Sequence, residues 1–295
     1  MKKRVAFVIN PNSGPDKKTN RLELIQRLLK ADYDAEIFLW KNISDKDNIF
    51  KKVLEGNFDI AVAVGGDGTV SQLAEVLAGT KTALAILPFG SGNGLARHLG
   101  VPMNHVEAMK LINDGTIVEM DCPEVNNQPF FCTSGVGFDA RIGKLFADSK
   151  TRGLKTYAQI TVREFIAYQG EHLTITIDGK TLERQAFLVT VANAGQYGNN
   201  AWIAPEASVT DSLLHIAVLK PFRWFNMLSL AIRLFAKNIH KSRFVETYTG
   251  HEVRIQREAP GAIHYDGEPA EMGTVLTYKI TDKKLRVVAG KSSGI

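Results

Sequence analysis

The sequence predicts an α/β protein: an N-terminal Rossmann-like parallel-sheet domain, followed by a C-terminal antiparallel β-sandwich domain. In the first 120 residues, short apolar runs alternate with helical repeats, which is typical of a parallel sheet with right-handed crossovers. After Asp121 the segments alternate apolar with polar residues, as antiparallel strands covered on one face do. A length of 295 residues is enough for two such domains.

The first domain is expected to span residues 1–122. Its predicted strands are apolar runs at 5–9, 35–40, 59–64 and 83–87. Its predicted helices carry apolar residues three and four positions apart, at 21–30, 44–55, 70–79 and 104–113. Ser44 and Asn104 are the expected caps, because their side-chain oxygens can accept from the first backbone N–H groups of a helix.

The second domain, residues 123–295, contains a hairpin signal. The alternating runs 173–177 and 181–192 flank Asp178-Gly179, a pair that favours a tight turn between antiparallel strands. Further strands are predicted at 213–219, 243–249, 253–257 and 275–280. The prediction allows the last strand of the chain to belong to the first domain instead of the second.

The turn Gly65-Gly66-Asp67-Gly68-Thr69 is the most informative segment of the chain. It follows the apolar run 59–64 and opens a helix, so it lies at the edge where parallel sheets bind ligands. Its glycines let backbone N–H groups approach an anion. Asp67 would repel a bare phosphate, so it implies Mg²⁺ or a polar partner nearby. The alternative is a turn that only packs a strand against a helix.

Two more turns rich in glycine, asparagine and serine follow strands of the same domain, at 10–14 and 90–94. Because parallel strands end at one edge of their sheet, the three turns are predicted to line a single crevice. Arg97 lies in the helix after the third turn, where it could meet a phosphate or pair with an acid.

Composition narrows the classes of partner. A net charge of +5 and a pI of about 9.1 fit an anionic ligand or an anionic membrane surface. The sequence contains no basic helix interleaved with aromatic residues, a pattern that would indicate binding to nucleic acid. Cys122 and Cys132 form no CxxC pair, which fits a reducing cytoplasm and indicates no zinc site. No stretch approaches the roughly 18 apolar residues of a membrane span.

Eight motifs follow one another along the chain: Asn10-Pro11-x-Ser13-Gly14, Gly65 to Thr69, Pro88 to Arg97, Gly135-x-Gly137-Phe138-Asp139, Asn193 to Gly198, Ala204 to Ala207, Asp211-x-Leu213 and Asp266-Gly267-Glu268. With these motifs the sequence resembles the diacylglycerol kinase catalytic family, which includes bacterial lipid kinases and sphingosine and ceramide kinases. The first motif alone is shared with NAD kinases and phosphofructokinases, whereas the ordered set is specific and covers essentially the whole chain.

The resemblance implies a lipid kinase that uses ATP and Mg²⁺, with the nucleotide-binding site in the first domain and the lipid-substrate site in the second. Asp67 and Glu268 would be catalytic, Glu268 as the base that takes the proton from the lipid hydroxyl. The residues that would contact the nucleotide or its Mg²⁺ are Asn10, Pro11, Ser13, Gly14, Gly65, Gly66, Asp67, Gly68, Thr69, Ser91 and Asn93. The residues implied in metal binding are Asp121 and Asp139, in an acidic network, and Asp211 with main-chain oxygens of Ser208 and Leu213, at a structural Mg²⁺.

Simpler interpretations stay open for three of these residues. Asp266-Gly267 could be only a hairpin turn, Asp139 could be a helix N-cap, and Asp211 is a structural feature on either interpretation. The chain also departs from many bacterial diacylglycerol kinases, with Ser71-Gln72 for Asn-Glu, Gly94 for an acid and Ser212 for a glycine. Gly94 therefore has no side-chain carboxylate with which to contact Mg²⁺ directly.

The sequence therefore predicts a kinase for the hydroxyl of diacylglycerol or a related lipid. The Gly-Ser-Gly-Asn form at 90–93 resembles sphingoid-base kinases more, which makes a sphingoid base the main alternative substrate. An NAD kinase and a sensor without catalysis are more distant alternatives. The stretches 90–97 and 204–213 argue against an NAD kinase. The presence of both Asp67 and Glu268 argues against a sensor.

The segment 222–237 bears on the membrane, because it is a helical pattern of large apolar residues studded with Arg and Lys. Packing on the protein's own sheet is favoured over a place in a bilayer interface, with partial exposure expected. The protein is expected to be cytoplasmic and peripheral at the inner membrane face, where its lipid substrate lies. The sequence leaves open whether it forms a homodimer.

Overall fold

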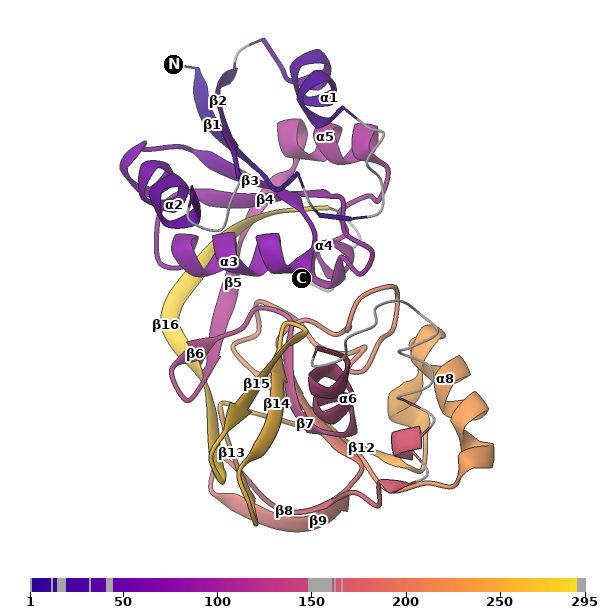
Figure 1. Ribbon diagram of the computed structural model, residues 1–295. Helices are drawn as coiled ribbons and strands as arrows, with labels where there is room; N and C mark the ends of the chain where they lie inside the picture. The colour runs from indigo at the N-terminus through magenta and orange to yellow at the C-terminus, as the bar shows by residue number, and fades with distance from the viewer. Residues whose placement is uncertain are drawn as a thin grey trace. The chain divides into compact units, whose positions relative to one another are not determined.

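A parallel sheet forms the first of two units in the computed structural model (Figure 1), which describes residues 2–290 apart from 12, 15–19, 32, 41–44, 148–160, 162 and 166. The first unit comprises Met1–Cys122 with Asp282–Ile295, and the second comprises Pro123–Thr281. The end of the chain belongs to the first unit because the long strand β16 (Val275–Ala289) starts in the second and ends in the first.

The sheet of the first unit has the strand order β2 (Tyr33–Leu39), β1 (Lys3–Ile9), β3 (Ile60–Gly65), β4 (Ala83–Pro88). All of these strands are parallel, and the end of β16 adds a further parallel strand beside β4. Every residue of β3 and β4 is buried, which explains their unbroken apolar sequences. The strand β5 (Thr116–Val125) pairs with β16.

Helices connect these strands close to the predicted positions. They are α1 (Arg21–Leu28), α2 (Lys46–Glu55), α3 (Asp67–Leu77), α4 (Gly94–His98) and α5 (His105–Asp114). The side chain of Asn104 accepts from the backbone N–H groups of Val106 and Glu107, which confirms the predicted cap of α5. The expected cap of α2, Ser44, lies outside the described residues.

Two antiparallel sheets form the second unit. One contains the first part of β16 with β13 (Glu252–Arg257), β8 (Glu171–Ile177) and β9 (Lys180–Ala186). The other has the order β12 (Val245–Gly250), β11 (Leu214–Leu219), β10 (Leu188–Ala192), β7 (Thr133–Gly137), β14 (Gly261–Tyr265), β15 (Glu268–Met272). A short strand, β6 (Gln128–Pro129), pairs with β5.

The core of the second unit lies between these two sheets. Val189 and Ile216 of one sheet meet Ile175, Ile255 and Tyr278 of the other, and all are buried. The predicted β-sandwich is thus confirmed. Alternate residues of β10 and β11 point to the outer face of their sheet, away from this core. A second hydrophobic cluster covers them there. Its covering elements include α8 (Met227–Phe235) and the short helix η3 (Ile239–Lys241). The short helix η2 (Trp224–Asn226) directly precedes α8 and has no buried residue.

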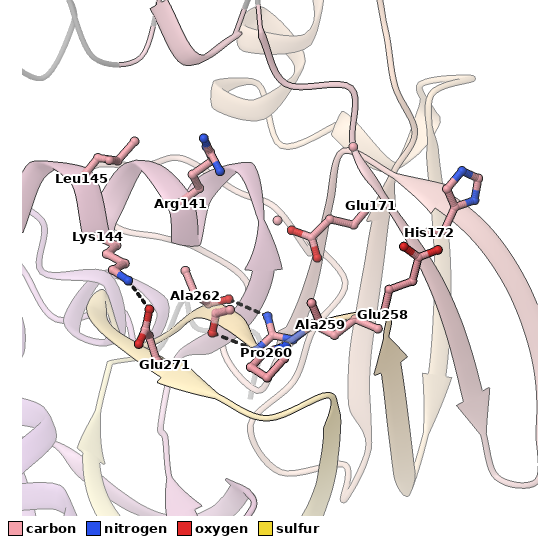
Figure 2. Close-up of a pocket in the computed structure, with 14 residues that line it drawn as sticks. Arg141, Lys144, Leu145, Glu171, His172, Glu258, Ala259, Pro260, Ala262 and Glu271 are labelled. Carbon is pink, nitrogen blue, oxygen red and sulfur yellow. Dashed lines mark hydrogen bonds and ion pairs between the residues drawn. The ribbon is translucent and has the colours of Figure 1, made fainter.

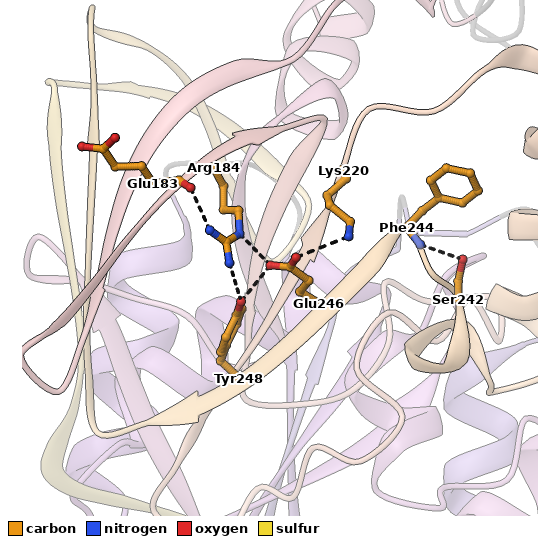
Figure 3. Close-up of polar contacts among 7 residues, drawn as sticks. All are labelled: Glu183, Arg184, Lys220, Ser242, Phe244, Glu246 and Tyr248. Carbon is orange, nitrogen blue, oxygen red and sulfur yellow. Dashed lines mark hydrogen bonds and ion pairs between the residues drawn. The ribbon is translucent and has the colours of Figure 1, made fainter.

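A polar cluster joins the edge strands of the two sheets (Figure 3). Arg184 of β9 donates to the Glu246 carboxylate of β12 at 2.8 Å, and the Tyr248 hydroxyl donates to it at 2.7 Å. Lys220 lies 3.3 Å from the same carboxylate. The hydrogen bond from Arg184 lowers the pKa of Glu246 to about 2, and those from Tyr248 and Lys220 add to the effect. The cluster holds the sandwich closed along this edge.

Two strand predictions are wrong in detail. The single strand predicted at 181–192 is two strands, β9 and β10, which belong to different sheets. The chain crosses between the sheets at Phe187, whose N–H donates to the Leu219 carbonyl at 2.6 Å. The strand predicted at 275–280 continues to Ala289, because its later part finds a partner in the first unit.

Candidate active site

The three predicted turns lie together at the carboxyl edge of the parallel sheet. The first follows β1, the second joins β3 to α3, and the third follows β4. Backbone bonds join the neighbouring strand ends at these turns: the Asn10 N–H donates to the Val64 carbonyl at 3.2 Å, and the Phe89 N–H donates to the Gly65 carbonyl at 2.8 Å. The prediction of a shared sheet edge is therefore confirmed within the first unit.

Close backbone approach explains why glycine is used in these turns. Gly14 has φ +75, and a Cβ there would lie 1.5 Å from the Phe89 carbonyl oxygen. A Cβ on Gly66 would lie 3.1 Å from the Gly90 Cα. Asn10 adds a side-chain link, since its Nδ2 donates to the Oγ1 of the buried Thr69 at 3.2 Å. Larger residues at Gly14 would force the first and third turns apart.

Asp67 has a polar partner within the first unit. Its carboxylate accepts from the backbone N–H of Asn93 at 2.9 Å and from that of Gly94 at 2.7 Å. The sequence had predicted either Mg²⁺ or a polar partner at this carboxylate. Asp67 lies partly buried in the first turn of α3. Its two hydrogen bonds therefore join the second turn to the third.

Asn93 is predicted to bind the nucleotide, but its side chain is buried and bonded within its own turn. It has φ +51, a left-handed conformation that asparagine tolerates, and its Nδ2 donates to the Gly90 carbonyl at 2.7 Å. Arg97 donates to the Gly92 carbonyl at 3.1 Å, a backbone contact that the sequence did not indicate. Both residues shape the third turn, whereas Ser91 is exposed on it.

Arg21 is a site residue that the sequence analysis missed. Its guanidinium donates to the Asn10 carbonyl, to the Ser13 carbonyl at 2.5 Å and to the Ser13 Oγ at 3.2 Å. It also lies 4.4 Å above the centre of the Phe89 ring, and it is buried. Arg21 thus fixes the first turn against the third. Its position at the start of α1 carries no distinctive motif that would have revealed this.

The acidic residues predicted for the metal network have protein partners. Asp121 of β5 is completely buried and forms an ion pair with Lys284 of β16. Burial, with the Asp121 charge beside it, raises the pKa of Cys122 to about 12. A buried carboxylate requires such a counter-charge, so Lys284 explains how Asp121 is accommodated. Its part in binding Mg²⁺ stays a prediction.

Asp139 lies inside the second unit, as the second residue of α6 (Phe138–Ala147) rather than as a cap before it. Its Oδ2 accepts from the Tyr197 hydroxyl at 2.9 Å, and the Nε2 of the buried His264 lies 3.1 Å from the same atom. Tyr197 in turn bonds to Thr190. The network joins α6 to β10 and β14, and the sequence analysis had not connected His264 with it.

Glu268 is the first residue of β15 and is exposed. The preceding Asp266 and Gly267 form a two-residue hairpin turn, with φ +49 and +83. The turn does more than reverse the chain, because the Asp266 carboxylate accepts from the N–H groups of Phe131, Cys132 and Thr133 at 2.8, 2.7 and 3.2 Å. It therefore anchors the hairpin that presents Glu268.

Asp211 shapes a tight turn in the second unit. Its Oδ1 accepts from the Leu213 N–H at 3.0 Å, and its Oδ2 lies 2.9 Å from the His215 Nε2. Ser212 has φ +59, which explains why glycine is usual at this position of the motif. A carboxylate with main-chain oxygens is a donor set that Mg²⁺ accepts. The structural Mg²⁺ at Ser208, Asp211 and Leu213 stays a prediction.

A cavity of about 550 Å³ lies in the second unit (Figure 2). Lys144 and Glu271 form an ion pair on its wall. Arg257, whose pKa is lowered by burial, donates to backbone carbonyls, including that of Ala262 at 2.9 Å. Neither Glu268 nor Asp139 lines this cavity.

Comparison with known proteins identifies the family. Residues 4–125 match the model of the diacylglycerol kinase catalytic domain. Residues 133–289 match that of the YegS C-terminal NAD kinase beta sandwich-like domain. The chain belongs to the diacylglycerol kinase catalytic family. This confirms the resemblance that the motifs indicated, and the enzyme class is that of the lipid kinases.

Similar proteins cover most of the chain. A diacylglycerol kinase of Bacillus subtilis is 24% identical, over 90% of both chains. A protein of Pseudomonas aeruginosa named probable lipid kinase YegS-like is 26% identical, over 97% of this chain and 94% of its own. An uncharacterized protein of Synechocystis is 28% identical, over 96% of this chain and 69% of its own.

Solved structures share the fold. A diacylglycerol kinase of Bacillus anthracis superposes with a TM-score of 0.76 at 22% identity, over 99% of this chain and 98% of its own. An NAD kinase of Archaeoglobus fulgidus, solved with ATP, gives 0.53 at 14% identity, over 98% of this chain and 94% of its own. In the described residues, no helix is long and apolar enough to cross a membrane.

Proposed function

We propose that the protein is an ATP- and Mg²⁺-dependent kinase that phosphorylates the hydroxyl of diacylglycerol or a related lipid. The observation that carries this proposal is the set of three linked turns at one edge of the parallel sheet. Phosphoryl transfer depends mainly on positioning and on neutralising charge, so turns whose backbones can approach phosphate oxygens suit it. Family membership supplies the reaction class.

In this proposal the nucleotide phosphates bind at the turns of the first unit, against the N-terminus of α3. The positive end of the helix dipole and nearby backbone N–H groups favour an anion there. Mg²⁺, when bound, supplies positive charge to the phosphate oxygens. The Asp67 carboxylate fits such an ion because its two backbone bonds leave acceptor capacity on its oxygens. Asp67 would thus hold the third turn in place and also face the metal.

Glu268 is the proposed general base. It is exposed at the start of β15 on a hairpin that Asp266 anchors, so its position is defined while its carboxylate can be reached. It would take the proton from the lipid hydroxyl as that oxygen bonds to the γ-phosphorus and ADP leaves with the bridging oxygen. Asp139 is the next candidate, but two protein groups already contact it.

A sphingoid base is the alternative lipid, because the Gly-Ser-Gly-Asn form of the third turn resembles that of sphingoid-base kinases. A relative named diacylglycerol kinase supports the first choice. Either substrate would place the protein at the inner face of the membrane as a peripheral enzyme, which is part of the proposal.

A transfer assay with radiolabelled ATP tests the proposal on diacylglycerol, sphinganine, ceramide and NAD, each with Mg²⁺ or with a chelator. We expect label in diacylglycerol or sphinganine, lost with the chelator. Label only in NAD would replace the lipid kinase with an NAD kinase. Binding of ATP without transfer to any acceptor would favour a sensor.

A further inference from the structure

One face of α8 and of the preceding turn η2 is apolar and open to solvent. The exposed fractions are 75% for Trp224, 56% for Phe225, 71% for Leu228, 61% for Ile232 and 58% for Phe235. Of the ten large hydrophobic side chains that are exposed in the described residues, these and Met227 make up six. Such a concentration marks an interaction surface. The segment is thus partly exposed, as the sequence analysis expected for a helix packed on its own sheet.

The opposite face of α8 holds the helix to the second unit. Leu230 is buried in the cluster on the outer face of the β10–β11 sheet, and Leu234 packs against that cluster. With about 100° between successive residues, Leu228 and Ile232 stand roughly opposite this leucine pair. The outer residues Phe225, Leu228, Ile232 and Phe235, hereafter the apolar stripe, are therefore not needed to seat the helix. Figure 1 shows α8 at the margin of the second unit.

The charge along the segment that carries the apolar stripe has a single sign. From Ser212 to Val245 the sequence contains no Asp or Glu, but it contains six Lys and Arg residues. Four of the six are exposed: Arg223, Lys237, Lys241 and Arg243. A second copy of this chain would bring like charges together across the contact. A surface of anionic lipid headgroups instead complements the basic residues and accepts the apolar side chains.

We propose that α8 and η2 dock the protein on an anionic lipid bilayer, with the apolar stripe at the boundary between headgroups and acyl chains. Trp224 suits the headgroup level, because its ring is apolar and its N–H is polar. The basic residues beside the stripe would face lipid phosphates. This inference deepens the proposed function by naming the surface through which a lipid kinase would reach its substrate.

Vesicle co-sedimentation without ATP tests the inference. We expect the protein to bind vesicles of phosphatidylcholine with phosphatidylglycerol and to bind pure phosphatidylcholine vesicles far more weakly. The double variant Leu228→Ser with Ile232→Ser should lose at least about tenfold in partition, since each leucine or isoleucine contributes on the order of a tenfold gain when it enters an apolar phase. Leu22→Ser with Leu54→Ser, two exposed leucines of the first unit, is the matched control and should bind as the wild type does.

A second variant keeps the test decisive if the serine pair unfolds the protein. Arg223→Gln with Arg243→Gln leaves the stripe intact and should weaken binding to the anionic vesicles, with Lys180→Gln as a control at an exposed lysine elsewhere. Equal binding by wild type and both double variants would overturn the inference, as would equal binding to neutral vesicles. A stripe variant that only abolishes self-association in sedimentation velocity would assign the face to a dimer instead. Because no turnover is measured, a failed kinase assay leaves this result unaffected.

Discussion

Replacing Asp67 by asparagine separates two roles of this carboxylate. The side chain accepts two backbone N–H bonds, at 2.9 and 2.7 Å, from the third turn. Asparagine keeps one carbonyl oxygen, so one bond is lost and an NH₂ group is set against a backbone donor. Hydrogen bonds to a charged group contribute about 1.5–3 kcal/mol each. Because Asp67 is partly exposed, we expect a loss of about 2 kcal/mol in the free energy of opening this turn.

Amide hydrogen exchange at Asn93 and Gly94 is the direct assay. A loss of about 2 kcal/mol corresponds to roughly thirtyfold faster exchange at the freed N–H, if exchange proceeds by local opening. Kinase activity should fall in parallel. Asp34→Asn, at an exposed carboxylate of the same unit, controls for the loss of charge and should leave the exchange unchanged. Unchanged exchange in the Asp67 variant together with abolished activity would refute the linking role and leave only a role toward metal or nucleotide.

Three further predictions concern the second unit. Glu268→Gln should lower kcat by roughly 10²–10⁴-fold with ATP affinity nearly unchanged, because the amide cannot accept a proton. Asp266→Ala should destabilise the unit by about 3 kcal/mol and also lower activity, because three backbone N–H groups lose their acceptor and the hairpin carrying Glu268 loosens. Glu246→Gln should cost about 1–2 kcal/mol at neutral pH, a value reduced for solvent screening. Since the pKa of Glu246 is lowered by folding, its contribution is complete above about pH 4.5 and is lost as the pH falls toward 2, so the two unfolding curves should converge there.

Each of these has its own control. Normal kcat in the Glu268 variant would move the base elsewhere, with Asp139 next. Asp178→Ala is matched to the Asp266 variant, because Asp178 also starts an Asp-Gly turn and accepts from the N–H groups of His251 and Glu252. The Asp178 variant should destabilise the unit without changing kcat. Equal kcat in the two variants would show that Asp266 does not position Glu268. A constant stability difference between pH 7 and pH 2 would contradict the role of Glu246.

Local signals were sufficient for most of the first unit. Strands such as β3 are buried on both faces, so their apolar, β-branched sequences are unambiguous, and Asn104 caps its helix through a contact only two and three residues away. The second unit was harder. β7 contains two glycines in five residues and reads as a turn, and the change of sheet at Phe187 depends on a bond to Leu219.

Sequence alone determined the class of fold, the family and the three turns that belong together, because strand ends and glycine turns are encoded by neighbouring residues. Tertiary structure alone decided the partners of the polar residues: Asp67 with the third turn, Arg21 with the first, Asp121 with Lys284, and Asp266 with the segment from Phe131 to Thr133. These contacts join segments up to 163 residues apart. It also decided that α8 buries its leucine side and leaves its apolar stripe in solvent, because a helical repeat shows that faces exist but not which one meets the core.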